Sequence, residues 1–368
     1  MKKDQKMNIS DITARFSVDL PAKPFGNGHI NSTYAVGNPP KYVLQKINTD
    51  VFTDPEGLMG NVVAVTSYLR ERITEAGGDP ERETLTYLPT TSGAYFYRDG
   101  EDNCWRMYRF IGDAKSFEAA TPALFADSAR AFARFQRMLA AFPAATLKET
   151  IPQFHDTGAR LGQLQAAVAE NRSGRAASVR AEIDFALARA EETHVITDAI
   201  ADSSVPLRVT HNDTKLNNVL FDEKTGKALC VIDLDTVMPG SLLYDYGDAL
   251  RFGASTAAED ETDLSKVHFD LDLFRAYTDA YLEVLGDRMT PREIELLPTG
   301  AKLMTLECGM RFLADHINGD VYFRIHRENH NLDRARTQFK LVAEMEEKAE
   351  QMNGIVAEAC RKYHLSGS

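Results

Sequence analysis

The stretch that decides the fold is VTHNDTKLNNVLFD, residues Val209–Asp222, followed closely by ALCVIDLDTVMPGSLLYDYGD, residues Ala228–Asp248. Carboxylates and carboxamides gather here beside two short apolar runs, Val219–Phe221 and Leu229–Ile232. Unpaired polar groups next to buried apolar residues are costly, so these side chains need either partners or a chemical task. The pattern predicts a β-hairpin that carries a functional site.

The acidic and amide residues of this hairpin have a regular order. Asp213 lies in a loop after His211, Asn218 follows five residues later, and Asp233 and Asp235 end the next strand on the same side. Oxygen ligands of this kind suit Mg²⁺, and a separate carboxylate can deprotonate an attacking hydroxyl. The order predicts kinase-type phosphoryl transfer, with Asp213 as base and Asn218, Asp233 and Asp235 as metal-binding residues. His211 is expected to orient the loop.

Composition limits the class of protein. A chain of 368 residues predicts about two domains, and 43% apolar with 26% charged residues is typical of a globular protein. No apolar run approaches the roughly 18 residues of a membrane span, and the start lacks the apolar core of a secretory signal. The cytoplasm is therefore the expected location. The net charge of −12 argues against nucleic-acid or anionic-membrane partners, but a small phosphorylated ligand remains compatible with it.

The first third of the chain favours strands. Residues Phe25–Val36 and Lys41–Ile47 are rich in β-branched and aromatic residues and are joined by a GNPP turn. Residues Pro55–Gly78 carry apolar side chains at helical spacing and end in two glycines. Residues Gly93–Ile111 predict another hairpin around an Asp-Gly turn. A small antiparallel sheet with one long helix is expected over residues 1–112.

The rest of the chain favours helices. Thr121–Phe142 forms a strongly amphipathic pattern, and helices are also expected over residues 176–193, 265–315 and 335–361. We therefore predict an α+β protein of two lobes. Residues 1–112 would bind nucleotide, and residues 113–368 would form a larger, mostly helical lobe that holds the catalytic hairpin and binds the acceptor.

A glycine-containing segment precedes the second predicted strand. In FGNGHINS, Gly26 and Gly28 flank Asn27 with the spacing of a phosphate-covering loop, while Asn31 replaces the third glycine of G-x-G-x-x-G. Because this segment stands before YVLQKI and the catalytic hairpin, we predict that Gly26, Asn27 and Gly28 contact ATP.

Two further parts of the nucleotide site can be placed. The strand YVLQKI should supply a cation for the α- and β-phosphates, and Gln45 and Lys46 compete because neighbouring strand residues point to opposite faces. We favour Lys46 for its charge. Backbone groups of Met107, Tyr108 and Arg109 fall at the junction of the predicted lobes, and we expect them to contact adenine.

The chain resembles the aminoglycoside phosphotransferase and choline kinase superfamily, which shares a protein-kinase-like two-lobed fold, and more narrowly the N-acetylhexosamine 1-kinases. The resemblance rests on YVLQKINTDVF, IPQFHDT, VTHNDTKLNNVLFD, VIDLDTVMPGSLLYDYGDALRF and CGMRFLADHINGDVYFRIHRENHNLDRARTQ. It implies ATP- and Mg²⁺-dependent phosphorylation of the anomeric C1 hydroxyl of N-acetylglucosamine or N-acetylgalactosamine. It also implies that Asp213 is the base and that Asn218 and Asp233 hold magnesium.

The last of these stretches has the composition of a sugar site. Arg311 and Asp315 lie one helical turn apart, and Tyr322 follows after a glycine. Planar hydrogen-bonding groups and an aromatic surface suit a sugar ring, so Arg311 and Tyr322 are predicted to bind the acceptor, with Asp315 and His155 beside them. The alternative is that Arg311 and Asp315 belong to an ion-pair network between helices and that His155 only braces the site.

Other functions stay open at this point. The same core could phosphorylate an amino alcohol or an aminoglycoside, although a cationic acceptor requires an acidic pocket and Arg311 argues against one. The chain could also be a nucleotide-binding regulator or a metal-dependent hydrolase; the complete set of Asp213, Asn218 and Asp233 disfavours the regulator. The sequence does not determine the oligomeric state or the preferred hexosamine.

Overall fold

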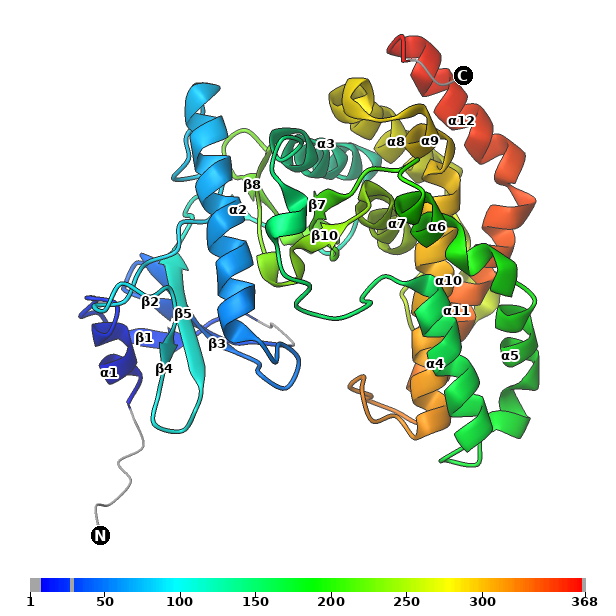
Figure 1. Ribbon diagram of the computed structural model, residues 1–368, viewed down its shortest axis with the longest axis horizontal. Helices are drawn as coiled ribbons and strands as arrows, with labels where there is room; N and C mark the ends of the chain where they lie inside the picture. Colours follow the sequence, from blue (N-terminus) through cyan, green and yellow to red (C-terminus); the bar gives the residue numbers. More distant parts are fainter. Residues whose placement is uncertain (1–7, 27–29, 366–368) are drawn as a thin grey trace. The chain divides into compact units, whose positions relative to one another are not determined.

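The computed structural model describes residues 8–26 and 30–365. The chain divides into two compact units (Figure 1), which are described one at a time. Unit 1 contains Met1–Ser116, Ala141–Pro152 and Val219–Met238, and unit 2 contains Phe117–Ala140, Gln153–Asn218 and Pro239–Ser368. Unit 1 thus takes in two later segments that a single boundary at residue 112 assigns to the helical part.

Unit 1 is built on a five-stranded antiparallel sheet with the order β1-β2-β3-β5-β4. Its strands are β1 (Ala22–Pro24), β2 (Ser32–Val36), β3 (Tyr42–Ile47), β4 (Tyr97–Arg98) and β5 (Cys104–Arg109). Across β3 and β5, Gln45 pairs with Arg106 and Lys46 pairs with Trp105. Directly opposed residues project from the same face of a sheet, so Gln45 and Arg106 share one face and Lys46 and Trp105 share the other.

The long helix predicted for this part is α2 (Pro55–Glu75), and a shorter helix, α1 (Ile9–Ala14), precedes the sheet. Asp54 caps α2, because its carboxylate accepts a hydrogen bond from the Gly57 N–H at 2.9 Å. The apolar positions expected on the buried face of α2 are confirmed, since all five are at most 3% exposed: Leu58, Val62, Val65, Leu69 and Ile73.

The catalytic hairpin predicted from the sequence belongs to a second sheet of unit 1. Strands β8 (Val219–Asp222) and β9 (Ala228–Val231) form the hairpin, and β6 (Ala114–Lys115) pairs with β8. The pairing of β6 with β8 explains why this hairpin groups with the strand-rich part of the chain.

Unit 2 is mostly helical. Its helices are α3 (Pro122–Met138), α4 (Thr157–Glu170), α5 (Arg180–Leu187), α6 (Val195–Ala201), α7 (Leu242–Gly253), α8 (Leu271–Leu285), α9 (Pro291–Glu295), α10 (Leu297–Asn318), α11 (His330–Glu347) and α12 (Ala349–Lys362). Two short strands, β7 (Arg208–Thr210) and β10 (Met238–Gly240), pair with each other. The α+β, protein-kinase-like fold class predicted from the sequence is confirmed. None of the helices in residues 8–26 and 30–365 is long and apolar enough to cross a membrane.

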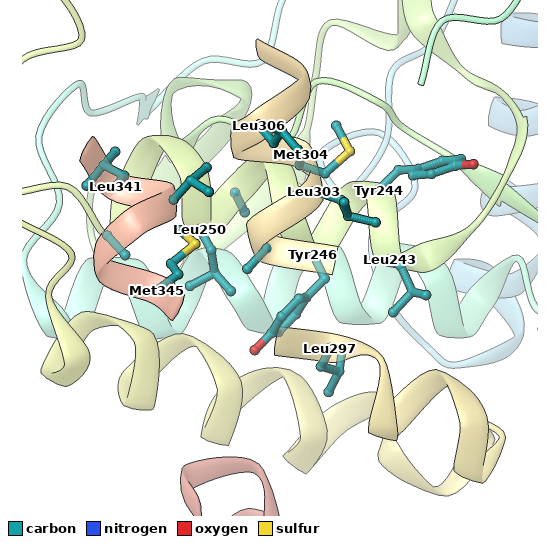
Figure 2. Packing of buried hydrophobic residues seen from close by; sticks show 14 of the residues in the cluster. Leu243, Tyr244, Tyr246, Leu250, Leu297, Leu303, Met304, Leu306, Leu341 and Met345 are labelled. Atoms are coloured by element: carbon teal, nitrogen blue, oxygen red, sulfur yellow. The ribbon is translucent and has the colours of Figure 1, made fainter. Parts of the chain in front are cut away.

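Helix α10 lies at the centre of the core of unit 2 and packs against α7, α4 and α11. Figure 2 shows Tyr246 and Leu250 of α7 beside Leu303 and Met304 of α10. The crossing of α7 and α10 requires a glycine, since a Cβ at Gly247 would lie 2.4 Å from the backbone oxygen of the facing helix. This close approach fixes α7, which in turn holds the catalytic loop.

Candidate active site

The catalytic loop begins where β7 ends, and the buried carboxylate of Asp245 on α7 holds its first residues. The backbone N–H groups of His211 and Asn212 donate to Asp245 at 3.0 and 2.8 Å, and the Gln136 amide donates to it at 2.6 Å. Burial raises the pKa of Asp245, while His211 and these three hydrogen bonds act in the opposite direction. Asp245 therefore has a structural task and fixes the backbone just before Asp213.

A second carboxylate of α7 holds the other side of the loop. Asp248 accepts a hydrogen bond from the Thr214 N–H at 3.0 Å and is paired with Arg251 Nε at 2.9 Å. The Thr214 hydroxyl donates to the Asp245 carbonyl. Asp213 thus lies between two backbone segments that are anchored to the same helix.

The structure brings Asp213 and Asn218 together, as expected from the sequence motif. The Asn218 amide nitrogen donates to Asp213 Oδ2 at 3.0 Å and to the Asp213 carbonyl at 2.8 Å. Its amide oxygen has no hydrogen-bond donor among the described residues, which leaves that atom available as a metal ligand. The two side chains therefore fit the roles of base and ligand.

Lys215 is a member of this site that sequence reasoning missed. Its Nζ lies 2.8 Å from Asp213 Oδ1. Burial alone would raise the pKa of Asp213, but the Lys215 ammonium outweighs it, with help from His211 and Arg251, and the pKa falls below its ordinary value of 3.8. Asp213 is consequently an ionised carboxylate at neutral pH, ready to accept a proton. The signal in the sequence was the lysine two residues after the aspartate.

Asp233 follows β9 in unit 1, whereas Asp213 and Asn218 belong to unit 2. Its backbone is left-handed, with φ 58° and ψ 60°. This conformation is uncommon for residues other than glycine and occurs often at functional sites. The turn after β9 therefore presents Asp233 in a conformation that the surrounding structure has to maintain.

Asp235 has protein partners in place of the metal predicted from the sequence. Its Oδ1 lies 2.5 Å from Arg106 Nη1, and its Oδ2 accepts a hydrogen bond from the Asn31 amide at 2.7 Å. Both Arg106 and Asp235 are buried, at 1% and 4% exposure. Burial would lower the pKa of Arg106, but the charge of Asp235 raises it overall. Both carboxylate oxygens of Asp235, which the sequence predicts as a metal ligand, thus lie against protein groups.

The two candidates for the phosphate-facing side chain, Gln45 and Lys46, lie on opposite faces of β3. Gln45 lies on the Arg106 face of β3, where its amide oxygen accepts hydrogen bonds from Arg106 Nε and Nη2 at 3.0 and 2.8 Å. Lys46 points from the opposite face, and its Nζ donates to Asn103 Oδ1 at 3.3 Å. Alternation along the strand allows only one of the two on each face. The cation on the Asp235 face of the sheet is therefore Arg106.

Of the predicted phosphate loop, only Gly26 is among the described residues, and Asn27 and Gly28 lie outside them. Gly26 has φ +74°, which favours glycine, and a Cβ there would meet no atom within 4 Å. Its backbone conformation therefore accounts for the glycine without a packing requirement.

The backbone at residues 107–109, which the sequence predicts to contact adenine, lies inside the sheet. The Met107 carbonyl accepts the Leu88 N–H at 2.8 Å, and the Arg109 N–H donates to the Thr86 carbonyl at 2.9 Å. Tyr108 forms a bridge with Tyr87 on the same edge. These groups are used by strand pairing.

A pair of aromatic rings lies close to this strand end. Phe25, just before the glycine segment, and Phe110, just after β5, have ring centroids 5.9 Å apart in an edge-to-face arrangement. Phe25 is exposed, and the Phe110 ring is partly exposed. Sequence reasoning missed this pair because the two residues are far apart in the chain.

In unit 2, His155 braces the catalytic loop. Its Nδ1 lies 2.8 Å from Glu307 Oε1, and its Nε2 lies 3.0 Å from the Asn212 carbonyl. Thr157 donates to the other oxygen of Glu307 at 3.1 Å. Both ring nitrogens are thus used within the protein, as the alternative bracing role expects.

Asp315 holds the loop that follows α10. Its Oδ1 accepts the N–H groups of Val321 and Tyr322 at 3.0 and 2.8 Å, and its Oδ2 accepts those of Phe323 and the Asn331 amide, both at 2.9 Å. The residue is 5% exposed. With four donors on one carboxylate, Asp315 positions this loop.

Arg311 and Tyr322 are differently placed. The Arg311 guanidinium carbon lies 5.3 Å from the Phe154 ring centroid and 5.6 Å from that of Phe323. Within the described part of the chain, Arg311 has neither a hydrogen-bond acceptor nor a carboxylate partner. Tyr322 is 64% exposed, and its ring meets that of Phe323 at 4.8 Å. The structure brings these predicted acceptor residues together around one aromatic ring.

This group is tied to the catalytic loop through short links. Phe154 precedes His155 in the chain and packs on its ring at 4.4 Å, and His155 contacts the Asn212 carbonyl next to Asp213. Glu307, the other partner of His155, lies one turn before Arg311 on α10. The position of Arg311 is therefore mechanically linked to the loop that carries Asp213.

A cavity of about 500 Å³ in unit 2 lies on another part of this loop. Its lining includes Leu216 from the catalytic loop, Arg251 from α7, and Glu259 and Gln338. None of the four residues predicted for the sugar site, Arg311, Asp315, Tyr322 and His155, is in that lining.

Comparisons with known proteins concern the family and the fold of this chain. Residues 21–285 match the model of a family described as the phosphotransferase enzyme family. A microcompartment-associated aminopropanol kinase has a similar structure, with a TM-score of 0.59 and 16% identity over 94% of this chain and 98% of that one. An aminoglycoside phosphotransferase from Alicyclobacillus acidocaldarius also has a TM-score of 0.59, with 13% identity over 99% and 98% of the two chains.

A third solved structure adds information on ligands. An amicoumacin kinase in complex with AMP-PNP and Ca²⁺ has a TM-score of 0.56 and 11% identity over 89% of this chain and 88% of that one. At these identities the likenesses concern the fold, and the family match carries the activity class. The chain belongs to the phosphotransferase enzyme family and is an enzyme that transfers phosphate to a hydroxyl acceptor.

Proposed function

We propose that this enzyme is an ATP- and Mg²⁺-dependent kinase that phosphorylates the anomeric C1 hydroxyl of N-acetylhexosamines. The observation that carries the proposal is the environment of Arg311. This guanidinium lies near two aromatic rings and has no hydrogen-bond or ion-pair partner within the described residues, and it is linked to the catalytic loop through Phe154 and His155. A group prepared in this way suits a neutral ligand with carbonyl and hydroxyl acceptors.

The charges near Arg311 favour a sugar over a cationic acceptor. The pKa of Arg160 is lowered first by burial and then by the positive charge of Arg311. The two guanidinium groups therefore influence each other. The nearby carboxylates of Glu307 and Asp315 already accept hydrogen bonds from protein groups. An amino alcohol would face two guanidinium groups, and like charges in contact oppose binding. The other nearby carboxylate is Asp156, whose Oδ1 accepts the Ala159 N–H at the start of α4.

An N-acetylhexosamine meets the same site with suitable groups. Its acetamido carbonyl and ring hydroxyls can accept hydrogen bonds from the planar Arg311 fork, and its apolar ring face can lie on an aromatic side chain. Tyr322 and Phe323 offer such a surface. Asp315 would act indirectly in this scheme, by holding the loop that carries both rings.

Asp213 is the proposed base. It would accept the proton of the C1 hydroxyl as the sugar oxygen attacks the terminal phosphorus of ATP in line with the departing ADP. The Lys215 ammonium keeps the carboxylate ionised beforehand, and the Asn218 amide fixes one of its oxygens. An anomeric hydroxyl is more acidic than an ordinary alcohol, so a carboxylate is an adequate base.

The proposed metal ligands are Asn218 and Asp233, a pairing that rests on their order in the sequence motif. The donor set fits Mg²⁺, which commonly takes one or two protein oxygens together with substrate phosphates. Among the residues that the structure describes, no group of three His, Cys, Asp or Glu side chains forms a separate metal centre. When bound, Mg²⁺ would offset the charge that develops on the phosphate oxygens.

The remaining nucleotide contacts are proposed from unit 1. The segment Gly26, Asn27 and Gly28 would cover the phosphates, as the sequence motif predicts. The exposed rings of Phe25 and Phe110 offer an apolar edge to adenine.

The test is Mg²⁺-dependent ADP release from ATP with a panel of acceptors: N-acetylglucosamine, N-acetylgalactosamine, glucose, galactose, choline, 1-aminopropan-2-ol and kanamycin. We expect turnover with the two N-acetylated sugars and little with the amines. Asp213→Asn serves as the control for contaminating kinases. Turnover with choline, aminopropanol or kanamycin alone would remove the sugar proposal and leave the kinase in place. ADP release that needs no acceptor would indicate a hydrolase.

A further inference from the structure

One buried ion pair in unit 1 is not used by the mechanism above. Arg106 on β5 and Asp235, two residues after Asp233, are 1% and 4% exposed, and the atoms Nη1 and Oδ1 lie 2.5 Å apart. Neither atom has a partner with good hydrogen-bond geometry, so the contact is held by charge. Burying two charges costs free energy. The best-attested use of a buried ion pair is to specify one structural arrangement among several.

Arg106 is fixed by a row of side chains that crosses three strands. Thr33 of β2 lies opposite Gln45 of β3, and Gln45 lies opposite Arg106 of β5. The Gln45 amide donates to the Thr33 hydroxyl at 3.2 Å, and its oxygen accepts two hydrogen bonds from Arg106. Because Gln45 is a neutral amide, it orients Arg106 without balancing the positive charge of the guanidinium. That charge is balanced by Asp235.

Asp235 is held from a second side by Asn31. The Asn31 amide nitrogen donates to Asp235 at 2.7 Å, while its oxygen accepts the Asn48 N–H at 2.9 Å. Asn31 stands where a third glycine would complete the phosphate-loop pattern. The end of that loop is therefore attached to the turn that carries Asp233 in its left-handed conformation.

We infer that Arg106, Asp235 and Asn31 form a latch that sets the position of Asp233 relative to the start of β2. Asp235 is then a positioning residue and not a metal ligand, and Arg106 is the cation that holds it. The inference rests on the proposed use of ATP and Mg²⁺. The function of the latch is to keep the metal-binding carboxylate of Asp233 and the start of β2 in one arrangement.

The two roles of Asp235 predict different nucleotide binding. A metal ligand contributes only when the metal is present, so its loss weakens Mg·ADP binding and leaves metal-free ADP binding unchanged or stronger. A latch holds the turn at Asp233 and the start of β2, which follows the proposed nucleotide-binding segment, in one arrangement whether or not metal is bound. Its loss should therefore weaken the binding of ADP and of Mg·ADP by a similar factor.

The experiment is calorimetric titration of the full-length protein with ADP, once with EDTA and once with Mg²⁺. The variants are Asp235→Asn, Arg106→Met and the double variant. We expect each single variant to weaken both titrations by about tenfold, and the double variant to lose no more than either single one, as for residues that act as a unit. Arg106→Lys should recover part of the loss, because it restores the charge.

Arg82→Gln is the matched control, since Arg82 forms an ion pair of 2.9 Å with Asp222 on the same hairpin but has no contact with the latch. It should leave both titrations unchanged. If Arg106→Met does not fold, Arg106→Lys and Asp235→Asn carry the test. Loss confined to Mg·ADP in Asp235→Asn, or no loss in either variant, would overturn the latch. Failure of the unmodified protein to bind ADP at all would instead contradict the proposed function.

Discussion

Two arginine side chains of this enzyme are placed in opposite circumstances. Arg106 in unit 1 is buried, with Asp235 and Gln45 around its guanidinium. Arg311 in unit 2 is half-buried, with two aromatic rings near its guanidinium and no acceptor or carboxylate partner in the described part of the chain. A guanidinium taken from water needs partners, so the first is already satisfied by the protein and the second is left for a ligand.

The difference separates two kinds of functional arginine. Removing a partner from Arg106 leaves an uncompensated buried charge, which disturbs the structure around it. Removing Arg311 takes away a group on which no described carboxylate depends, so the fold should persist while acceptor binding is lost. The predictions below follow from this contrast, beginning with the largest expected effect.

Asp213→Asn should impair the chemical step while leaving intact the binding of nucleotide and acceptor, to which Arg106 and Arg311 are assigned. The variant keeps the shape of the side chain but cannot accept the proton, so turnover should fall by at least about a hundredfold, as expected for loss of a general base. Calorimetric affinities for Mg·ADP and for the acceptor should change little. Retained turnover in Asp213→Asn would show that another residue is the base. It would also remove the proposed connection between the Arg311 acceptor site and the loop that performs the chemistry.

Arg311→Met should impair the acceptor side alone. We expect kcat/KM for the acceptor to fall by roughly ten- to a hundredfold, the value of one or two hydrogen bonds from a charged donor, with KM for Mg·ATP unchanged. Arg324→Met, on the exposed loop that follows α10, is the control. If Arg311→Met raised KM for Mg·ATP as much as it lowered kcat/KM for the acceptor, Arg311 would not act on the acceptor alone, and the two arginines would not have separate roles.

Lys215→Met should change the pH dependence of the reaction. Burial would raise the pKa of Asp213, and the Lys215 ammonium is the largest cause that lowers it. Asp213 must be deprotonated to act as base, so activity is lost as the pH falls through its pKa. Without Lys215 that pKa rises, and the acidic limb of the kcat/KM profile should move to higher pH. A profile that does not move would mean that Lys215 has no electrostatic effect on Asp213.

Glu344→Gln tests whether a loss of stability alone can produce the changes in binding and kinetic constants expected of the arginine variants. Burial would raise the pKa of Glu344, but hydrogen bonds from Lys348, Lys340, His268 and the Phe269 N–H lower it to about 2. The carboxylate therefore stabilises the fold above its ordinary pKa of 4.5, and this contribution is lost as the pH falls towards 2.

At pH 7 we expect Glu344→Gln to lower Tm by a few degrees, in line with roughly 2–4 °C for each kcal/mol in a domain of this size. The difference from the unmodified protein should narrow between about pH 4.5 and pH 2 when melting is followed by circular dichroism. Kinetic constants at 25 °C should be unchanged. A gap in Tm that stays constant with pH would mean that the charge of Glu344 is not what stabilises this region.

Local patterns in the sequence were sufficient for the fold and for the catalytic loop. The apolar spacing of α2 predicted its buried face, and the order of Asp213 and Asn218 predicted their contact. Both depend on residues that are close in the chain, where helical period and loop length limit the possibilities.

Long-range contacts were not predictable in this way. The choice between Gln45 and Lys46 depended on strand register, and a slip of one residue reverses the face. The partner of Asp235 is Arg106, on another strand far away in the sequence, so no spacing rule connects them. Asp315 accepts hydrogen bonds mainly from backbone N–H groups, which leave no mark in the pattern of side chains.

The central claim is that the phosphate is placed on C1 of a neutral N-acetylhexosamine. The most direct measurement is the ³¹P and ¹H NMR spectrum of the product formed from N-acetylglucosamine and ATP with Mg²⁺. The account predicts a phosphorus signal coupled to the anomeric proton, and no product with Asp213→Asn. Coupling to the C6 protons would contradict the proposed regiochemistry, and phosphorylation of choline or aminopropanol with no sugar phosphate would contradict the role given to Arg311.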